Sequence, residues 1–261
     1  MRVATWNLKQ AVAPKKSLDE LWRRAETELG AEVVVFTEAK VPKAGIPFGW
    51  DARWHEGGIG PRRRWGTVLA GRGVSLHPVR PLGRLRKRPF ASQWPAAVQA
   101  AEIHVGGTVW GAVIGIYGLT VDLEGNSVGH GRITVPQMFA EVAGVVDTYR
   151  NVVVAGDLNL WPRDKPQIID DLGLVDVVEV TAAQRPPLDG CSGCSMGDGC
   201  GHMWTHRNGN SPNARVQHLD YLFATAPLVR SIRTVRGGVA DFPSAWELSD
   251  HAPVVADFRE P

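Results

Sequence analysis

Runs of apolar residues divide the chain into predicted strands and helices. The unbroken β-branched runs at 33–37 and 152–156 predict buried strands. Segments 17–30 and 133–149 place apolar side chains at helical spacing, and Ser17 and Gly30 suit the two ends of the first helix. Shorter patterns predict strands at 2–6, 66–71, 74–79, 97–104, 109–117, 216–224, 229–236 and 253–258, and a short helix at 165–172.

The order of these elements indicates the fold class. Buried strands recur in both halves of the chain, and the two main helices lie between them. This order predicts an α/β fold in which two β-sheets pack together and are flanked by helices. A length of 261 residues without a repeat or a clear linker favours one domain over 1–261. Loops are expected over 40–64, and 181–213 has the weakest pattern.

Composition and charge exclude several classes of protein. With 44% hydrophobic and 21% charged residues, the chain is expected to be globular rather than disordered. It has no apolar run of 18 residues, so no membrane span is predicted. The N-terminus shows no secretory pattern, so we expect a cytoplasmic protein. The net charge of +2 excludes a histone-like coat but leaves two basic stretches, 62–64 and 80–88, as local patches or solvated loops.

Polar side chains stand where predicted buried strands meet loops, which is where functional residues concentrate. Each of them alone has a structural explanation as a turn residue, an ion-pair partner or a buried histidine. Their recurrence at several strand ends favours a shared site. These residues are Asn7, Glu38, Asp157, Asn159, Asp220, Asp250 and His251.

Three of these residues carry the oxygen atoms that hard cations prefer. Glu38 and Asp250, with Asn7, suit Mg²⁺ or Mn²⁺. Such a metal polarises a phosphate oxygen and stabilises the charge that develops during hydrolysis. The set therefore indicates metal-dependent phosphoester hydrolysis.

The remaining residues suit proton transfer in the same reaction. Asp157 can orient or deprotonate a water molecule, and Asn159 can bind that water or the phosphate. His251, oriented by Asp220, can donate a proton to a phosphate oxygen.

Six segments together resemble the endonuclease/exonuclease/phosphatase superfamily, the group of exonuclease III and DNase I. They are TWN at 5–7, VVVFTEAK at 33–40, IYGLT at 116–120, VVVAGDLN at 152–159, QHLDYLFAT at 217–225 and LSDHAPVVADF at 248–258. The resemblance implies a four-layer α/β sandwich with its active site at one end of the sheets. It supports the roles given above and implies that Tyr117 contacts the phosphate.

Two positions depart from the family pattern. Lys9 stands where abasic-site endonucleases usually have an acidic residue, and Thr120 replaces a phosphate-binding Asn. These departures leave the number of catalytic metals and the DNA-repair role open.

A second candidate metal site lies in a loop near 189–206. Cys191, Cys194, Cys200 and His202 offer three sulfurs and one nitrogen, which suits a tetrahedral structural Zn²⁺. The alternatives are three reduced thiols or, less favoured, a disulfide. His206 is a rival fourth ligand, or instead lies at the rim of the active site.

The substrate is less clear from the residues. Trp161 and Trp246 stand close to motif residues and could stack a base or belong to the core. Candidates for phosphate contacts are Arg132, Arg163 and Arg185. These features favour a nuclease with a nucleic-acid partner over a phosphatase or phosphodiesterase for a small phosphorylated molecule or phospholipid head group. A catalytically silent module is disfavoured because the catalytic set is complete, and nothing points to a protein partner.

Overall fold

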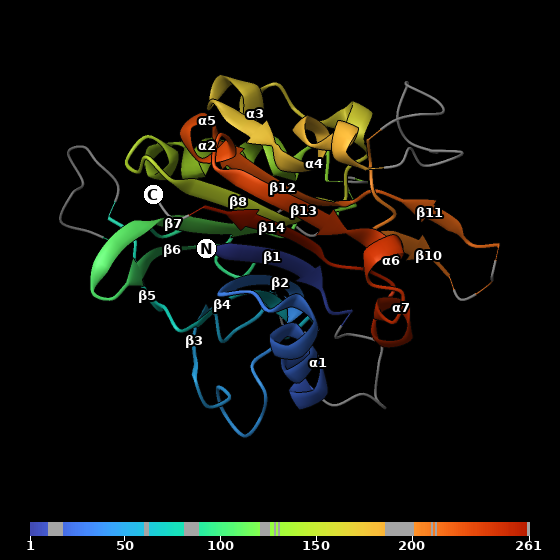
Figure 1. Ribbon diagram of the computed structural model, residues 1–261, viewed down its shortest axis with the longest axis horizontal. Coiled ribbons are helices and arrows are strands. Elements are labelled where there is room, and N and C mark those ends of the chain that lie inside the picture. Colours follow the sequence, from blue (N-terminus) through green and yellow to red (C-terminus); the bar gives the residue numbers. More distant parts are fainter. Residues whose placement is uncertain are drawn as a thin grey trace.

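Two six-stranded sheets pack face to face with helices on their outer sides (Figure 1). The computed structural model describes residues 1–9, 18–59, 63–80, 89–120, 126–127, 129, 131–185, 201–209, 211 and 213–259. The predicted α/β fold, a four-layer sandwich of two sheets flanked by helices, is confirmed.

The first sheet places two predicted site residues at the same edge. Its strand order is β13-β14-β1-β2-β4-β3, and only β1 and β2 are parallel neighbours. Because parallel strands end at the same side, Asn7 and Glu38 lie at the ends of adjacent strands. The strands are β1 (Arg2–Asn7), β2 (Val33–Ala39), β3 (Trp50–Trp54), β4 (Gly66–Arg72), β13 (Ile232–Gly237) and β14 (Val254–Phe258).

The second sheet brings two aspartates together through strand pairing. Its order is β5-β6-β7-β8-β12-β9, with β7 and β8 parallel. The antiparallel register of β8 and β12 sets Asp157 opposite Asp220. The strands are β5 (Ser75–Pro78), β6 (Val98–Val105), β7 (Thr108–Ile116), β8 (Val152–Asp157), β9 (Leu174–Asp176) and β12 (Asp220–Thr225).

Helices form the outer layers. The first sheet is covered by α1 (Leu18–Arg24), which continues as the π-helical turn η1 (Ala25–Leu29). The second sheet carries α2 (Thr134–Val146), α3 (Ile168–Asp171), α4 (Val177–Val180) and α5 (Ala226–Val229), with the 3₁₀ turns η2 (Pro162–Asp164) and η3 (Ala182–Gln184). Near one end of the sandwich lie α6 (Gly238–Asp241), α7 (Ala245–Leu248) and a hairpin of β10 (His206–Asn208) and β11 (Arg215–Gln217), seen at the right of Figure 1. No helix among the described residues is long and apolar enough to cross a membrane.

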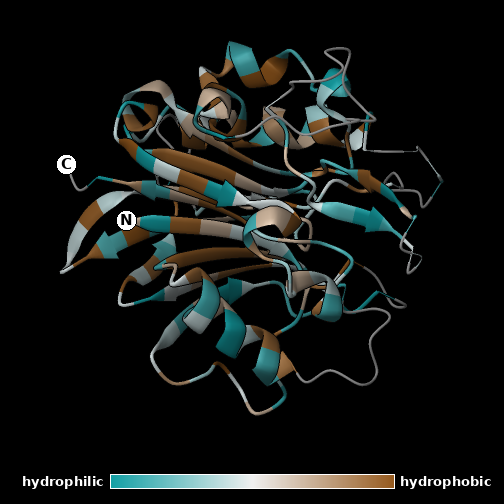
Figure 2. Cartoon of the chain, turned by 45° about the vertical axis from the view of Figure 1, so that its right-hand side comes forward, coloured by the Kyte–Doolittle hydropathy of each residue, from teal (hydrophilic) through white to brown (hydrophobic). Residues whose placement is uncertain are grey.

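The core consists of three apolar layers, and the brown strands of Figure 2 mark them. The middle layer lies between the sheets and includes Val35, Leu69 and Val153, all fully buried. Burying such a side chain contributes about 1.5–3 kcal/mol. Gly115 of β7 faces this layer, where a Cβ atom would stand 2.5 Å from Thr67 Cγ2 and 2.9 Å from Leu69 Cδ2. The two sheets are therefore in close contact at this glycine.

Several predicted boundaries differ from the structure. The strand predicted at 216–224 is two strands, β11 and β12, because β11 pairs with β10 outside the large sheets. The strand predicted at 229–236 begins only at Ile232, because α5 precedes it. Strand β3 lies within the predicted loop 40–64; it is a half-exposed edge strand and shows no clear alternation. The four-residue helix α3 lies within the short helix predicted at 165–172. The other four-residue helices, α4 to α7, were not predicted because one turn is too short to show a helical period.

Candidate active site

Asp157 is held at the junction of the two sheets. The Asn7 side-chain amide donates to Asp157 Oδ2 at 2.7 Å, and the backbone N–H of Asn159 donates to Asp157 Oδ1 at 2.8 Å. The Asn159 side-chain amide also donates to the carbonyl of Gly118 at 2.9 Å. Asp157 is 1% exposed. The structure thus brings together three predicted site residues and fixes the direction of the Asp157 carboxyl group.

The backbone around this carboxyl group adopts uncommon conformations. Among the described residues other than glycine, only Lys9, Glu38 and Asn159 have a positive φ, of 46°, 46° and 50°. Residues in this region are uncommon and concentrate at functional sites. Gly156, directly before Asp157, has a φ of 147°, and a Cβ there would stand 1.9 Å from the Ile116 carbonyl oxygen. Only glycine fits at this position.

His251 and Asp220 form a buried pair beside Asp157. His251 Nδ1 lies 2.7 Å from Asp220 Oδ2, and His251 Nε2 lies 3.9 Å from Asp157 Oδ2. The predicted orientation of His251 by Asp220 is therefore present in the geometry. The Thr205 hydroxyl oxygen accepts the Asp220 backbone N–H at 3.1 Å, and Ser249 Oγ accepts the His251 N–H at 3.1 Å.

Thr205 and Ser249 were not predicted from the sequence. Ser249 belongs to the LSDHAP segment, so its position directly before Asp250 was an available signal. Thr205 contacts the site from a segment with no clear pattern, so the sequence carries no comparable signal for it.

The pKa values of Asp157 and His251 are both raised, but burial has the opposite effect on the two groups. Burial raises the pKa of Asp157 to about 7, although the positive charge of His251 opposes this shift. Burial alone would lower the pKa of His251, but the carboxylates of Asp220 and Asp157 outweigh it and raise that pKa to about 10. At neutral pH His251 is therefore a charged donor, and Asp157 is poised between its two forms.

Glu38 and Tyr117 meet on the other side of the centre. The Tyr117 hydroxyl donates to Glu38 Oε1 at 2.9 Å. The Tyr117 ring packs edge-on against Trp65, with ring centroids 5.3 Å apart. Burial, and then the Glu38 charge, raise the pKa of Tyr117 well above its ordinary value. Tyr117 therefore stays protonated and can donate a hydrogen bond at any pH at which the protein functions.

Asp250 is bound by a lysine that occupies the unusual motif position. Lys9 Nζ lies 2.5 Å from Asp250 Oδ2, and the Lys9 backbone N–H donates to Asn7 Oδ1 at 2.9 Å. His206 Nε2 lies 3.9 Å from the same Asp250 oxygen, and its ring lies 4.5 Å from the His251 ring. Burial lowers the pKa of His206 to about 4, so this imidazole is neutral. His206 thus lies beside Asp250 and His251, close to the predicted active-site residues.

One oxygen of Asp250 is without a partner. Asp250 Oδ1 is buried and has no hydrogen-bond partner among the described residues, as expected of a ligand atom. Glu38 and Asn7 are the other two predicted ligands, with oxygen atoms of the kind that Mg²⁺ or Mn²⁺ prefers. Two further groups of described residues have ligand atoms within 4.8 Å of one another: His206, Asp250 and His251, and Asp157, Asp220 and His251. A metal at either group would compete with the proton of His251.

Of the four predicted zinc ligands, His202 lies within the described part of the chain. Cys191, Cys194 and Cys200 lie outside the described residues. His202 is half-buried, and its ring lies 5.3 Å from that of His218. Burial lowers the pKa of His202, which favours the neutral form that binds metals.

Trp161 and Trp246, the tryptophans predicted to contact substrate, each have an arginine guanidinium against the ring. The guanidinium carbon of Arg163 lies 4.3 Å from the Trp161 ring centroid, and that of Arg215 lies 4.7 Å from it. Arg207 lies 4.8 Å from the Trp246 ring centroid. Both indoles are half-buried.

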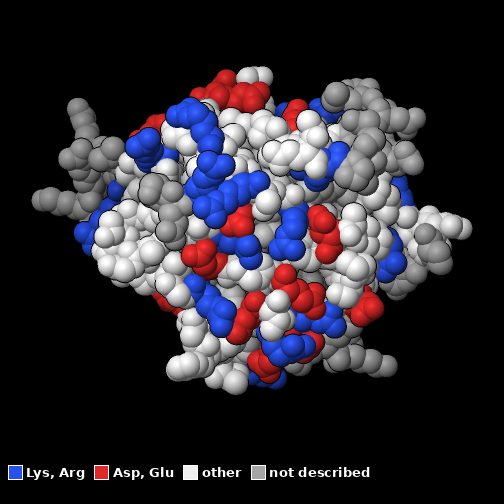
Figure 3. Space-filling view, viewed as in Figure 1, with Lys and Arg blue, Asp and Glu red and all other residues white. Residues whose placement is uncertain are grey.

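The predicted arginines differ in their surroundings. Arg132 is exposed and pairs with Asp164 at 2.9 Å. Arg185 instead binds backbone carbonyls, including that of Gly201 at 2.7 Å, so its role is structural. Most of the basic stretch 80–88 and Arg62 lie outside the described residues. In Figure 3, basic and acidic side chains are interspersed over the visible face, so no basic belt covers the described residues of that face.

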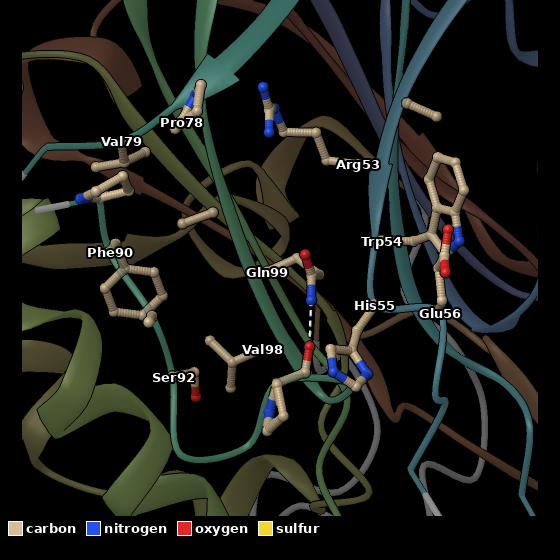
Figure 4. A pocket seen from close by; sticks show the side chains of 15 residues that line it. Arg53, Trp54, His55, Glu56, Pro78, Val79, Phe90, Ser92, Val98 and Gln99 are labelled. Carbon is tan, nitrogen blue, oxygen red and sulfur yellow. Dashed lines mark hydrogen bonds between the residues drawn. The ribbon is translucent and has the colours of Figure 1, made fainter.

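A separate pocket of about 520 Å³ lies between strand β3 and the segments around β5 and β6. Arg53, His55, Phe90 and Gln99 line it, as Figure 4 shows. None of the predicted catalytic residues lines this pocket, so it is distinct from the centre at Asp157.

Comparisons with known proteins agree with the fold. No protein-family model matches the sequence, and no curated protein matches it. Among solved structures, the 3′-5′ exonuclease NExo from Neisseria meningitidis is 18% identical, with a TM-score of 0.63 and full coverage of both chains. A second structure, of the Neisseria 3′ phosphatase NExo with product DNA hairpin, is 19% identical with a TM-score of 0.62 over the same coverage. An AP endonuclease from Archaeoglobus fulgidus is 16% identical, with a TM-score of 0.66 and full coverage of both chains. The chain therefore has the same fold as these structures, a sandwich of two β-sheets flanked by helices, as its motifs predicted.

Proposed function

We propose that this chain is a divalent-metal-dependent phosphodiesterase that cleaves nucleic acid. The observation that carries the proposal is the buried Asp157, held by Asn7 and Asn159 beside the His251–Asp220 pair. A base poised near neutrality next to a charged donor is what phosphoester hydrolysis requires. The similar solved structures support a nucleic-acid substrate, since they are described as an exonuclease, a DNA-bound 3′ phosphatase and an AP endonuclease.

The chain's own residues have distinct roles in this reaction. Asp157 accepts a proton from the water whose oxygen bonds to phosphorus, while the bond from phosphorus to the leaving oxygen breaks and that oxygen takes a proton from solvent. The two hydrogen bonds from Asn7 and Asn159 keep the Asp157 carboxyl oxygens in place. His251 donates from Nε2 to a phosphate oxygen while Asp220 holds Nδ1.

Tyr117 and the metal ligands complete the centre. Tyr117 holds Glu38 Oε1 and contacts the phosphate, as the family resemblance implied. Glu38, Asp250 and Asn7 would hold Mg²⁺ or Mn²⁺, which supplies charge stabilisation to the phosphate oxygens when bound.

The zinc site is a further part of the proposal. Cys191, Cys194, Cys200 and His202 would hold a structural Zn²⁺, which the Cys-x₂-Cys spacing and the burial of His202 support. Metal analysis of the purified protein tests it. One zinc per chain supports the site, whereas zinc well below one per chain with three titratable thiols contradicts it.

Hydrolysis of labelled substrates tests the proposed function. The substrates are a duplex with one abasic site, an intact duplex, a single strand and an aryl phosphodiester, each with Mg²⁺ or Mn²⁺ and with chelator. We expect metal-dependent cleavage of at least one nucleic acid, and loss of this activity in Asp157→Asn. Cleavage of the aryl ester alone would contradict the nuclease and indicate a small phosphoester as the substrate.

A further inference from the structure

Both tryptophans predicted to contact substrate, Trp161 and Trp246, have at least one guanidinium group on their rings. Trp161 contacts Arg163 and Arg215, and Trp246 contacts Arg207. Distances of 4.3–4.8 Å from carbon to ring centroid are well within the range of cation–π attraction. A ring face covered in this way is not open for a base to stack on it.

The β10–β11 hairpin connects the two tryptophans. Arg207 lies on β10 and Arg215 on β11, and the register pairs Arg207 with Val216, the neighbour of Arg215. Trp161 follows β8 of the second sheet, whereas Trp246 lies on α7, shortly before β14 of the first sheet. The arginines of one short hairpin therefore reach a tryptophan on each side of the sandwich.

The same elements lead directly into the catalytic cluster. Trp161 stands two residues after Asn159, which donates to Asp157. The Arg207 backbone N–H donates to the Asp250 carbonyl at 2.8 Å. The preceding residue, His206, forms an antiparallel β-bridge with His251 through the backbone. The three guanidiniums are thus carried by segments that also position catalytic side chains.

These guanidiniums have the hydrogen-bond donors that an anion requires. Arg163 and Arg215 are exposed residues. Arg207 Nε is buried and has no hydrogen-bond partner among the described residues, although its Nη2 donates to the Trp246 carbonyl at 3.4 Å. Stacking on an aromatic ring fixes the plane of a guanidinium, and the N–H groups in that plane suit phosphate oxygens.

We infer that Trp161 and Trp246 act as platforms that hold Arg163, Arg215 and Arg207 for the backbone phosphates beside the scissile bond, and that neither tryptophan stacks a base. This inference rests on the proposed nuclease function. It changes the predicted role of both tryptophans from base contact to the positioning of cationic groups.

Salt dependence separates the two roles. Removing a side chain that binds one phosphate of duplex DNA lowers the slope of log affinity against log salt by about 0.9, whereas removing a base-stacking ring leaves the slope nearly unchanged. The experiment measures binding of a fluorescent duplex by anisotropy at several salt concentrations, in the Asp157→Asn background so that the DNA stays intact. Variants Arg163→Ala, Arg215→Ala, Arg207→Ala and Trp161→Leu are added singly.

We expect each arginine variant to lower the slope by about 0.9. We also expect Trp161→Leu to lower it, because both guanidiniums lose their platform. Arg230→Ala is the matched control, since this exposed arginine follows α5 at the opposite end of β12 from Asp220. Trp161→Phe, which keeps an aromatic face, should retain most of the salt slope that Trp161→Leu loses.

Two outcomes would contradict this inference and leave the proposed function standing. One is that the arginine variants show the same salt slope as Arg230→Ala. The other is that Trp161→Leu weakens binding without changing the salt slope. Cleavage by the wild-type protein is measured in parallel. If the wild type neither binds nor cleaves nucleic acid, the proposed function fails and this inference fails with it.

Discussion

The side-chain amide of Asn7 and the carboxyl group of Asp157 are joined by a 2.7 Å hydrogen bond between strands of different sheets. Asn7 ends β1 and Asp157 ends β8, so neither sheet contains the catalytic arrangement alone. The bond fixes one carboxyl oxygen of Asp157, while the backbone of Asn159 fixes the other. The centre is therefore assembled by the packing of the two sheets.

Asp157→Asn should reduce hydrolysis by about 10²–10⁴-fold, because it removes the base and keeps the shape of the side chain. The amide oxygen of the new side chain can still accept from Asn7, whereas its NH₂ group can no longer accept the Asn159 N–H. The fold should persist, because one of the two hydrogen bonds remains. Since burial raises the pKa of Asp157 from 3.8 to about 7, ionising this group costs stability that is lost progressively between these two pH values and fully above pH 7. Thermal unfolding at pH 8 should therefore show an unchanged or higher midpoint. Asp170→Asn, at an exposed position of α3, is the control; a normal rate in Asp157→Asn would refute the assigned role.

Asp220→Asn and His251→Gln should act as one unit. Each should lower the rate by about 10²–10⁴-fold, because Asp220 orients His251 at 2.7 Å and stabilises its charge. The double variant should be no more than about tenfold slower than the slower single variant. Steady-state rates of the three proteins form the test. Fully multiplicative losses would show that the two residues act independently.

Lys9→Asp should strengthen Mn²⁺ binding at least about tenfold, since it removes an ammonium that lies 2.5 Å from Asp250 Oδ2 and adds an oxygen ligand. Titration of free Mn²⁺ followed by electron paramagnetic resonance measures this without any substrate. Lys43→Asp makes the same charge change at an exposed position outside the centre. Equal Mn²⁺ affinity in the two variants would show that Lys9 does not oppose the metal.

His218 should make the fold sensitive to acid. Burial, and then repulsion from His202, lower the pKa of His218 to about 3, against about 6.5 in an unfolded chain. The neutral form is thus favoured by folding, so this contribution is complete above pH 6.5 and is lost as the pH falls toward 3. His218→Gln should flatten the fall of the unfolding midpoint between about pH 7 and 4.5. His55→Gln, at an exposed position, should leave the pH dependence of the unfolding midpoint unchanged. An identical pH dependence in wild type and His218→Gln would contradict the role assigned to His218.

The site residues at the ends of strands were the easiest to predict from the sequence. Asp157 and Glu38 follow unbroken β-branched runs, so their positions at a sheet edge followed from the hydrophobic pattern. The ion pair of Lys9 with Asp250 could not be read in this way, because it joins residues at opposite ends of the chain. The contact of Arg215 with Trp161 likewise depends on the position of a three-residue strand, which is too short to leave a pattern.

Gly115 has a consequence for how the centre tolerates change. It faces Thr67 and Leu69 across the middle layer, so an added methyl group would require these side chains or the two sheets to shift. The Asn7–Asp157 bond spans the same gap, and a wider gap would lengthen it. The spacing of the two sheets thus helps to set the distance between Asn7 and Asp157. Substitutions deep in the core can therefore alter the proposed centre without replacing any of its residues.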